Sequence, residues 1–317
     1  MKTSNLVRLI LALAAAPALL AQDTPPPELR YDFRPGGRRG APAFAGDEFS
    51  EQRRPEPILY LGRMKPRALL SLRAPGNLAA TPPAQRRLLR SKDRDITGLV
   101  SLVSAQHQSG NGATRSVAAG ALPAIRVQYD PEMPETIEVP STPGTCVLLI
   151  EVGEGNNNDW QPGLWTLKLR LDASSLNVRL APFSSHGAPD PAAPETAVFF
   201  EMQFFAKRLA GPEDRANFAM FEYAEARTTL TGGPRALAAL DQVVQDFPRD
   251  GNVRMARAEL LHDQGRKTEA AAEAREVLRL TTNGALRSRL HTPGRQPMTR
   301  DQSAEWVKSK ISAWENP

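Results

Sequence analysis

A loop rich in carboxylate and amide side chains runs from residue 151 to residue 159, with the sequence Glu-Val-Gly-Glu-Gly-Asn-Asn-Asn-Asp. Oxygens of these types are the ligands that calcium prefers in proteins. The spacing does not follow the helical calcium-loop pattern, and a polar loop that joins two strands explains the same composition. We therefore favour a plain loop over a calcium site, and the sequence predicts no metal ion and no cofactor.

Histidine and cysteine, the other common metal ligands and catalytic groups, are sparse. The chain has four histidines, none paired with another at metal-ligand spacing, and one cysteine, Cys146, which excludes an intramolecular disulfide. The sequence contains no His-Glu-x-x-His run, no glycine-rich phosphate loop and no Gly-x-Ser-x-Gly elbow. These absences argue against an enzyme with a local catalytic motif. They leave open an enzyme whose site is dispersed over the fold.

The first residues predict an export signal. Lys2 and Arg8 precede an apolar run that ends at Leu20 and is too short to span a bilayer comfortably, and Ala21 offers a small residue for cleavage. We expect a secretory signal peptide over residues 1–21, with a retained signal anchor as the alternative. The prediction is bacterial-type export to the periplasm or outside the cell, with no transmembrane segment after the signal is removed.

Residues 22–118 are basic and rich in proline, although the whole chain carries a net charge of only +5. Such a composition buries too little apolar surface to offset the ordering entropy, so we expect a disordered segment. Residues 57–61 are strand-like and residues 85–105 could form a helix. The segment could contact an anionic envelope surface weakly. Nucleic acid is not expected, because aromatic residues are sparse and export separates the chain from most of it.

Residues 119–185 show alternating apolar residues between proline, glycine and asparagine turns. The clearest alternation runs from Trp165 to Leu171, with polar residues between the apolar ones. Short strands at this spacing predict a small antiparallel β-sandwich of immunoglobulin-like texture. Residues 186–194 have the composition of a linker.

From residue 195 onward the pattern favours helices, and we assign residues 195–317 to a helical domain. Gly-Pro and Gly-Gly-Pro punctuation separates the segments, and Pro234 suits the first position of a helix. The expected helices cover residues 195–209, 214–230, 234–247, 251–264, 267–280 and 299–314.

Small residues recur at a period of 34 in this region. Ala224 is followed by Ala258, and Ala236 by Ala270. Over residues 217–282 the chain resembles the tetratricopeptide repeat, a family of helix pairs that stack into an array. The resemblance implies that exposed side chains of the first helix in each pair line a concave binding face. The implied partner-binding residues are Met220, Tyr223, Asn252, Arg254 and Glu259.

Together these patterns predict a multidomain β + α protein with a disordered N-terminal segment. The function that they favour is an exported, non-catalytic scaffold that binds a protein or peptide partner in a tetratricopeptide-like groove. Two alternatives remain open at this point. One is an enzyme with a dispersed site, and the other is an accessory protein that binds the envelope through the basic segment.

Overall fold

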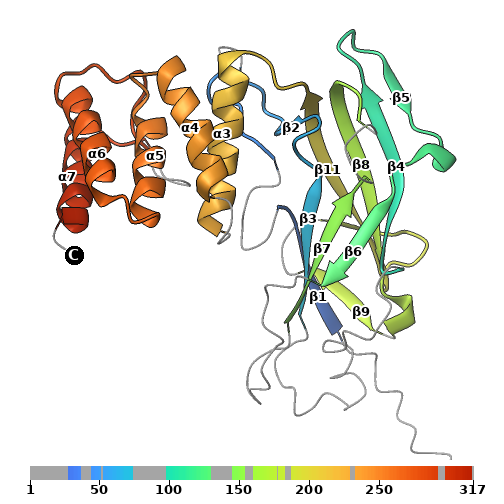
Figure 1. The fold of residues 1–317 in the computed structure, drawn as a ribbon. Helices are drawn as coiled ribbons and strands as arrows, with labels where there is room; N and C mark the ends of the chain where they lie inside the picture. Colours follow the sequence, from blue (N-terminus) through green and yellow to red (C-terminus); the bar gives the residue numbers. More distant parts are fainter. Residues whose placement is uncertain are drawn as a thin grey trace, which may run out of the picture.

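Strands fill the first two thirds of the described chain and helices the last third (Figure 1). The structure is a computed structural model that describes residues 28–36, 44–50, 53–73, 98–129, 145–153, 160–176, 178–182, 187–228, 233–291 and 297–315. The predicted signal peptide and most of the acidic loop at residues 151–159 lie outside these residues. The β + α class is therefore confirmed.

The strands form two mixed sheets. The first has the order β6-β7-β3-β1-β9 and the second the order β10-β11-β8-β4-β5, with β2 paired to β11. Two of the pairings, β1 with β9 and β2 with β11, are parallel, and the other pairings are antiparallel. The strands are β1 (Glu28–Pro35), β2 (Ile58–Tyr60), β3 (Arg67–Arg73), β4 (Val100–Gln108), β5 (Thr114–Ser116), β6 (Ile125–Tyr129), β7 (Thr145–Val152), β8 (Gly163–Asp172), β9 (Arg179–Pro182), β10 (Ala188–Pro189) and β11 (Ala197–Lys207).

The prediction that residues 22–118 are disordered is wrong for the described part of that segment. Strands β1 and β3 lie side by side inside the first sheet, and β4 pairs with β8 in the second. Tyr31 and Phe33 on β1 and Leu70 on β3 are buried, so these short apolar runs do bury enough surface once they are paired. Proline stands at the end of β1 and just before β3, where it costs no ladder hydrogen bond. The helix expected at residues 85–105 is also wrong at its end, because β4 begins at Val100.

The segment expected to be the first helix, residues 195–209, is instead the long strand β11. Phe200, Met202 and Phe204 are buried, whereas Glu201 and Gln203 between them are exposed. This period of two fits a strand with one face in the core. The dense aromatic content obscured the alternation and led to the prediction of a helix. The linker expected at residues 186–194 holds β10, which pairs with β11. The helices therefore begin at Gly211, not at residue 195.

The five described helices follow one another along the chain, and each packs against the next. Their bounds lie within three residues of the expected ones. Ala236 and Ala270 are fully buried in the helical core, and Gly265, with φ of 79°, makes the turn between the helix that ends at Asp263 and the helix that begins at Lys267. The helices are α3 (Gly211–Thr228), α4 (Gly233–Asp246), α5 (Gly251–Asp263), α6 (Lys267–Thr282) and α7 (Arg300–Glu315).

Helix α3 is joined to the second sheet by a buried carboxylate. The Asp214 side chain accepts hydrogen bonds from the Tyr60 hydroxyl at 3.2 Å and the Ala210 N–H at 3.1 Å, and pairs with Lys207 Nζ at 2.6 Å. Burial, with the negative charge of Asp214 as the next cause, raises the pKa of Tyr60, which therefore stays a donor. Phe218 of α3 packs edge-on against the Tyr60 ring. This junction fixes the first helix, and so the row of helices, against the sheets.

None of the described helices is long and apolar enough to cross a membrane.

Candidate functional site

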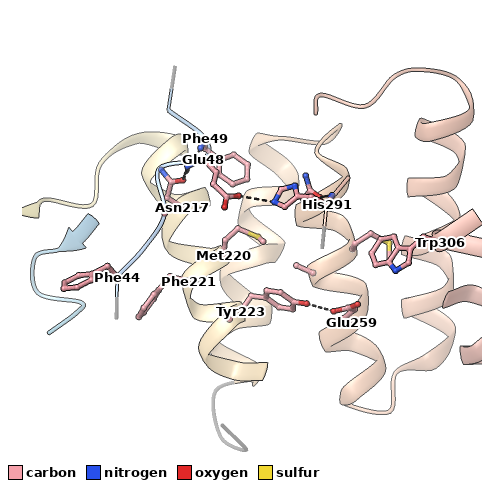
Figure 2. Close-up of a pocket in the computed structure, with 15 residues that line it drawn as sticks. Phe44, Glu48, Phe49, Asn217, Met220, Phe221, Tyr223, Glu259, His291 and Trp306 are labelled. Carbon is pink, nitrogen blue, oxygen red and sulfur yellow. Dashed lines mark hydrogen bonds and ion pairs between the residues drawn. The ribbon is translucent and has the colours of Figure 1, made fainter. Parts of the chain in front are cut away.

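A cavity of about 350 Å³ lies between α3, α5, α7 and two non-helical segments. We call it the array cavity (Figure 2). Residues 44–50 close it on one side, and His291 stands at its rim. The described residues that line it are Phe44, Gly46, Glu48, Phe49, Asn217, Met220, Phe221, Tyr223, Ala224, Asn252, Met255, Ala256, Glu259, His291 and Trp306.

Residues 44–50, which we call the docked segment, are held on α3 by one asparagine. Asn217 is buried, and its Oδ1 accepts the backbone N–H groups of Glu48 at 2.9 Å and Phe49 at 3.1 Å. Its Nδ2 donates to the Asp47 carboxylate at 3.2 Å. The Phe49 ring lies 5.6 Å from that of Phe247 and belongs to the helical core. The docked segment is thus a fixed wall of the cavity.

A second asparagine holds the segment at residues 286–291 in the same manner. Asn252 on α5 donates from Nδ2 to the Arg289 carbonyl at 3.2 Å and accepts the His291 N–H on Oδ1 at 3.1 Å. Leu290 lies so close to Gly251 that a β-carbon there would stand 2.6 Å from the leucine side chain. Any side chain at residue 251 would therefore force Leu290 and Leu286 to move from their observed positions.

Two polar pairs span the cavity (Figure 2). The Glu48 carboxylate faces His291, with Oε2 and Nε2 3.7 Å apart, and so joins the two non-helical segments. On the other side, the Tyr223 hydroxyl of α3 donates to the Glu259 carboxylate of α5. Lys310 of α7 donates to the same carboxylate at 2.8 Å. Met220 lies between the two pairs.

The protonation states of the second pair follow from burial and hydrogen bonding. Burial raises the pKa of Tyr223, and the neighbouring charge of Glu259 raises it further. Burial alone would raise the pKa of Glu259, but hydrogen bonds from Lys310 and Tyr223 outweigh it and leave this pKa below its ordinary value. At neutral pH the tyrosine is therefore a donor and the glutamate is an anion.

Four of the five residues predicted to bind a partner line the array cavity together: Met220, Tyr223, Asn252 and Glu259. Arg254 does not. Its guanidinium pairs with Glu273 of α6 at 2.5 Å and donates to the Pro248 carbonyl at 2.7 Å, so it stabilises the helix packing instead. A helix turns by 100° per residue, so neighbouring positions of α5 face different surfaces, and Arg254 faces α6 instead of the cavity.

Sequence reasoning missed the residues that complete the cavity, Glu48, Phe49 and His291. Asn217 and Asn252 hold these segments through backbone groups, which leave no trace in the residue types of the segments themselves. The asparagines were the available signal: they stand 35 residues apart, close to the repeat period, on two helices that line the same cavity.

The chemistry of the cavity is that of a binding site with polar ends. Aromatic rings, methionines and alanines make up most of the lining, and the described lining residues include two carboxylates, one imidazole and no cysteine, serine or threonine. A nucleophile of these last three types is therefore absent from the described lining. In the described part of the chain, no group of three or more histidine, cysteine, aspartate or glutamate residues could hold a metal ion.

No family model and no curated protein matches the chain. A solved structure that matches is a family 123 glycoside hydrolase from Clostridium perfringens, described for glycolipid glycan hydrolysis, with 11% identity and a TM-score of 0.25. The match covers 59% of this chain and 29% of the hydrolase, so the chain spans less than a third of that protein.

The expected function is corrected by this comparison. The sequence analysis favoured a non-catalytic scaffold, whereas the matched protein is an enzyme. At this TM-score the likeness assigns neither the fold nor the activity of the hydrolase to this chain.

Proposed function

We propose that the array cavity binds a small organic ligand with an apolar body and at least one polar group. The observation that supports this most directly is the cavity itself, which gathers apolar walls and two polar pairs from five separated stretches of the chain. A largely apolar cavity with a few placed polar groups is the usual form of a small-molecule site.

The proposal extends to the architecture. The two sheets share one hydrophobic core, in which Phe33 of the first sheet stacks on Phe200 of the second at 4.5 Å, and this supports a β-sandwich. The pairs α3–α4 and α5–α6, with buried alanines at a spacing of 34 residues, support a tetratricopeptide-like array. Export to the periplasm or outside the cell remains a prediction from the N-terminal sequence.

A small ligand fits better than a polypeptide, because the chain itself covers the helix face assigned to partner binding. Asn217 and Asn252, which could hold a foreign backbone, are satisfied by residues 48–49 and by residues 289 and 291. A bound peptide would have to displace both segments, including the buried Phe49 and Leu290. What remains open between them is a space of small-molecule size.

A second candidate function is an enzyme that acts on this ligand. The Glu48–His291 pair favours it, since a carboxylate beside an imidazole can orient that ring as a general base. The groups come from distant positions in the sequence, as a dispersed site requires. Envelope binding through the basic N-terminal segment is the remaining alternative, and release of the protein from anionic polymer at high salt tests it.

The binding proposal is tested by screening small molecules against the full chain for a rise in melting temperature. The variant Ala224→Trp fills the cavity from α3 and should lose the response to every hit. The control Ala272→Trp adds the same bulk at an exposed position of α6 and should keep the response. If Ala224→Trp does not fold, Met220→Trp fills the cavity from a half-buried position. Hits that bind both cavity variants as well as the wild type would refute the site.

The same hits separate the two candidates. Turnover of a hit, detected by mass spectrometry and lost in both Glu48→Gln and His291→Gln, supports the enzyme. Binding without turnover supports a binding protein.

A further inference from the structure

The two carboxylates that line the array cavity, one at each end, differ in how far their charge is neutralised by neighbouring groups. Glu259 is neutralised by Lys310 at 2.8 Å and accepts the Tyr223 hydroxyl. Glu48 faces only the His291 imidazole among the described ion pairs, at 3.7 Å, and its side chain is 53% exposed. The described lining residues include no lysine and no arginine. Glu48 is therefore the carboxylate that can still receive a cation from solution.

The nearby Arg287 is engaged elsewhere. Its guanidinium lies over the ring of Phe247 at 4.3 Å and that of Phe49 at 5.5 Å. It also donates to the Phe49 carbonyl at 3.5 Å. This arginine thus holds the docked segment against Phe247, the residue that follows α4.

The wall opposite the docked segment already holds an ammonium group of the protein itself. Lys310 Nζ lies 5.8 Å from the centre of the Trp306 ring and 6.0 Å from that of Trp314, and it donates to Glu259. Carboxylates and tryptophan rings together stabilise cations through charge and through the electrons of the ring face. The chain therefore uses this combination of groups for an ammonium at one end of the cavity, and the second carboxylate stands at the other end.

We infer that the ligand of the array cavity is an organic cation, namely a primary amine carried on an apolar or aromatic body. The body packs against Met220, Met255 and Trp306, and the ammonium group pairs with Glu48 at the rim. This inference rests on the proposed function, because it names the class of ligand for the same cavity.

Three indole probes of similar size test the charge. Tryptamine carries an ammonium group, tryptophol is neutral, and indole-3-acetate is an anion. In calorimetric titrations of the full chain at low salt, we expect tryptamine to bind about fivefold more tightly than tryptophol, because a partly exposed ion pair contributes up to about 1 kcal/mol. Indole-3-acetate should bind more weakly than tryptophol. The preference should shrink at high salt.

Glu48→Gln should remove the preference for tryptamine while leaving the affinity for tryptophol unchanged. The matched control Glu305→Gln alters a carboxylate one residue before Trp306 that is 73% exposed and outside the lining, and it should keep the preference. Equal affinities for the three probes in the wild type, or an unchanged preference in Glu48→Gln, would overturn the inference and leave the proposed function standing. If no hit of the screen loses its binding in Ala224→Trp, both this inference and the proposed function are overturned.

Discussion

The core of the sheets and the core of the helices differ in the size of their side chains and in which parts of the chain they join. The sheet core gathers large side chains such as Tyr60, Phe204 and Met202, and it joins strands that are far apart in the chain, as in the pairings of β1 with β9 and β2 with β11. The helical core is built around alanines, and each helix packs on its neighbour in sequence. Large side chains can bridge two separate layers, whereas small ones let helix axes approach closely. Truncation should therefore damage the sheets most, and enlargement should damage the helices.

The largest effect is expected for Phe200→Ala. Phe200 is 2% exposed and contacts the rings of Phe33 and Tyr31 across the two sheets at 4.5 and 5.5 Å. Its loss leaves a cavity that these rings cannot fill, at a cost of about 3–5 kcal/mol in the free energy of unfolding. Urea unfolding of the full chain measures this cost.

The control for that experiment is Phe199→Ala, on the other face of β11. Phe199 is half-buried, with Lys168 Nζ 4.1 Å above its ring, so its truncation should cost roughly 1 kcal/mol. Equal costs at the two positions would show that Phe200 does not join the sheets as described.

The enlargement Ala270→Leu should have the next largest effect. Ala270 is fully buried in the helical core, and added methyl groups force α6 away from its neighbours, at a cost of about 1–3 kcal/mol. Thermal unfolding monitored by circular dichroism measures it. Ala272→Leu on the exposed side of α6 is the control, and its stability should change by less than about 0.5 kcal/mol. A melting temperature unchanged by Ala270→Leu would contradict the close packing of α6 against its neighbours at this position.

This contrast also explains how far the sequence could be interpreted. Helix bounds were predictable because glycine and proline punctuation and a period of 34 are local signals. Strands β1 and β3 were not, because their stability comes from pairing with each other and with β7 and β9, which the local composition does not show. The residues of the array cavity fall into the same two groups, those that local patterns predict and those that they do not. Met220, Tyr223, Asn252 and Glu259 follow from the repeat. Glu48 and His291 are held at the cavity because their backbone N–H groups donate to the side chains of Asn217 and Asn252, which are far away in the sequence.

A smaller effect is expected at the start of α5. Asp250 caps this helix by accepting the N–H groups of Asn252 at 3.0 Å and Val253 at 3.1 Å. Asp250→Ala leaves both groups unpaired and should cost about 1 kcal/mol in the free energy of unfolding. Asp250→Asn keeps a side-chain oxygen for the cap and should cost less. If both variants are equally unstable, the charge of Asp250 and not its capping hydrogen bonds stabilises the helix.

The smallest effect should appear only in acid, at the end of the array cavity where Glu259 lies. Because its pKa is lowered in the folded state, the ionised form stabilises the fold, and this contribution is present above the ordinary value of 4.5 and is lost as the pH falls through the lower, folded value. Glu259→Gln has no such proton to bind. The free energy of unfolding of the wild type should therefore fall more steeply with decreasing pH below about 4.5 than that of Glu259→Gln. Glu305→Gln, at an exposed position of α7, should follow the wild-type curve. Parallel curves for wild type and Glu259→Gln, measured by urea unfolding between neutral pH and about pH 3, would mean that Lys310 and Tyr223 do not hold the carboxylate in its ionised form.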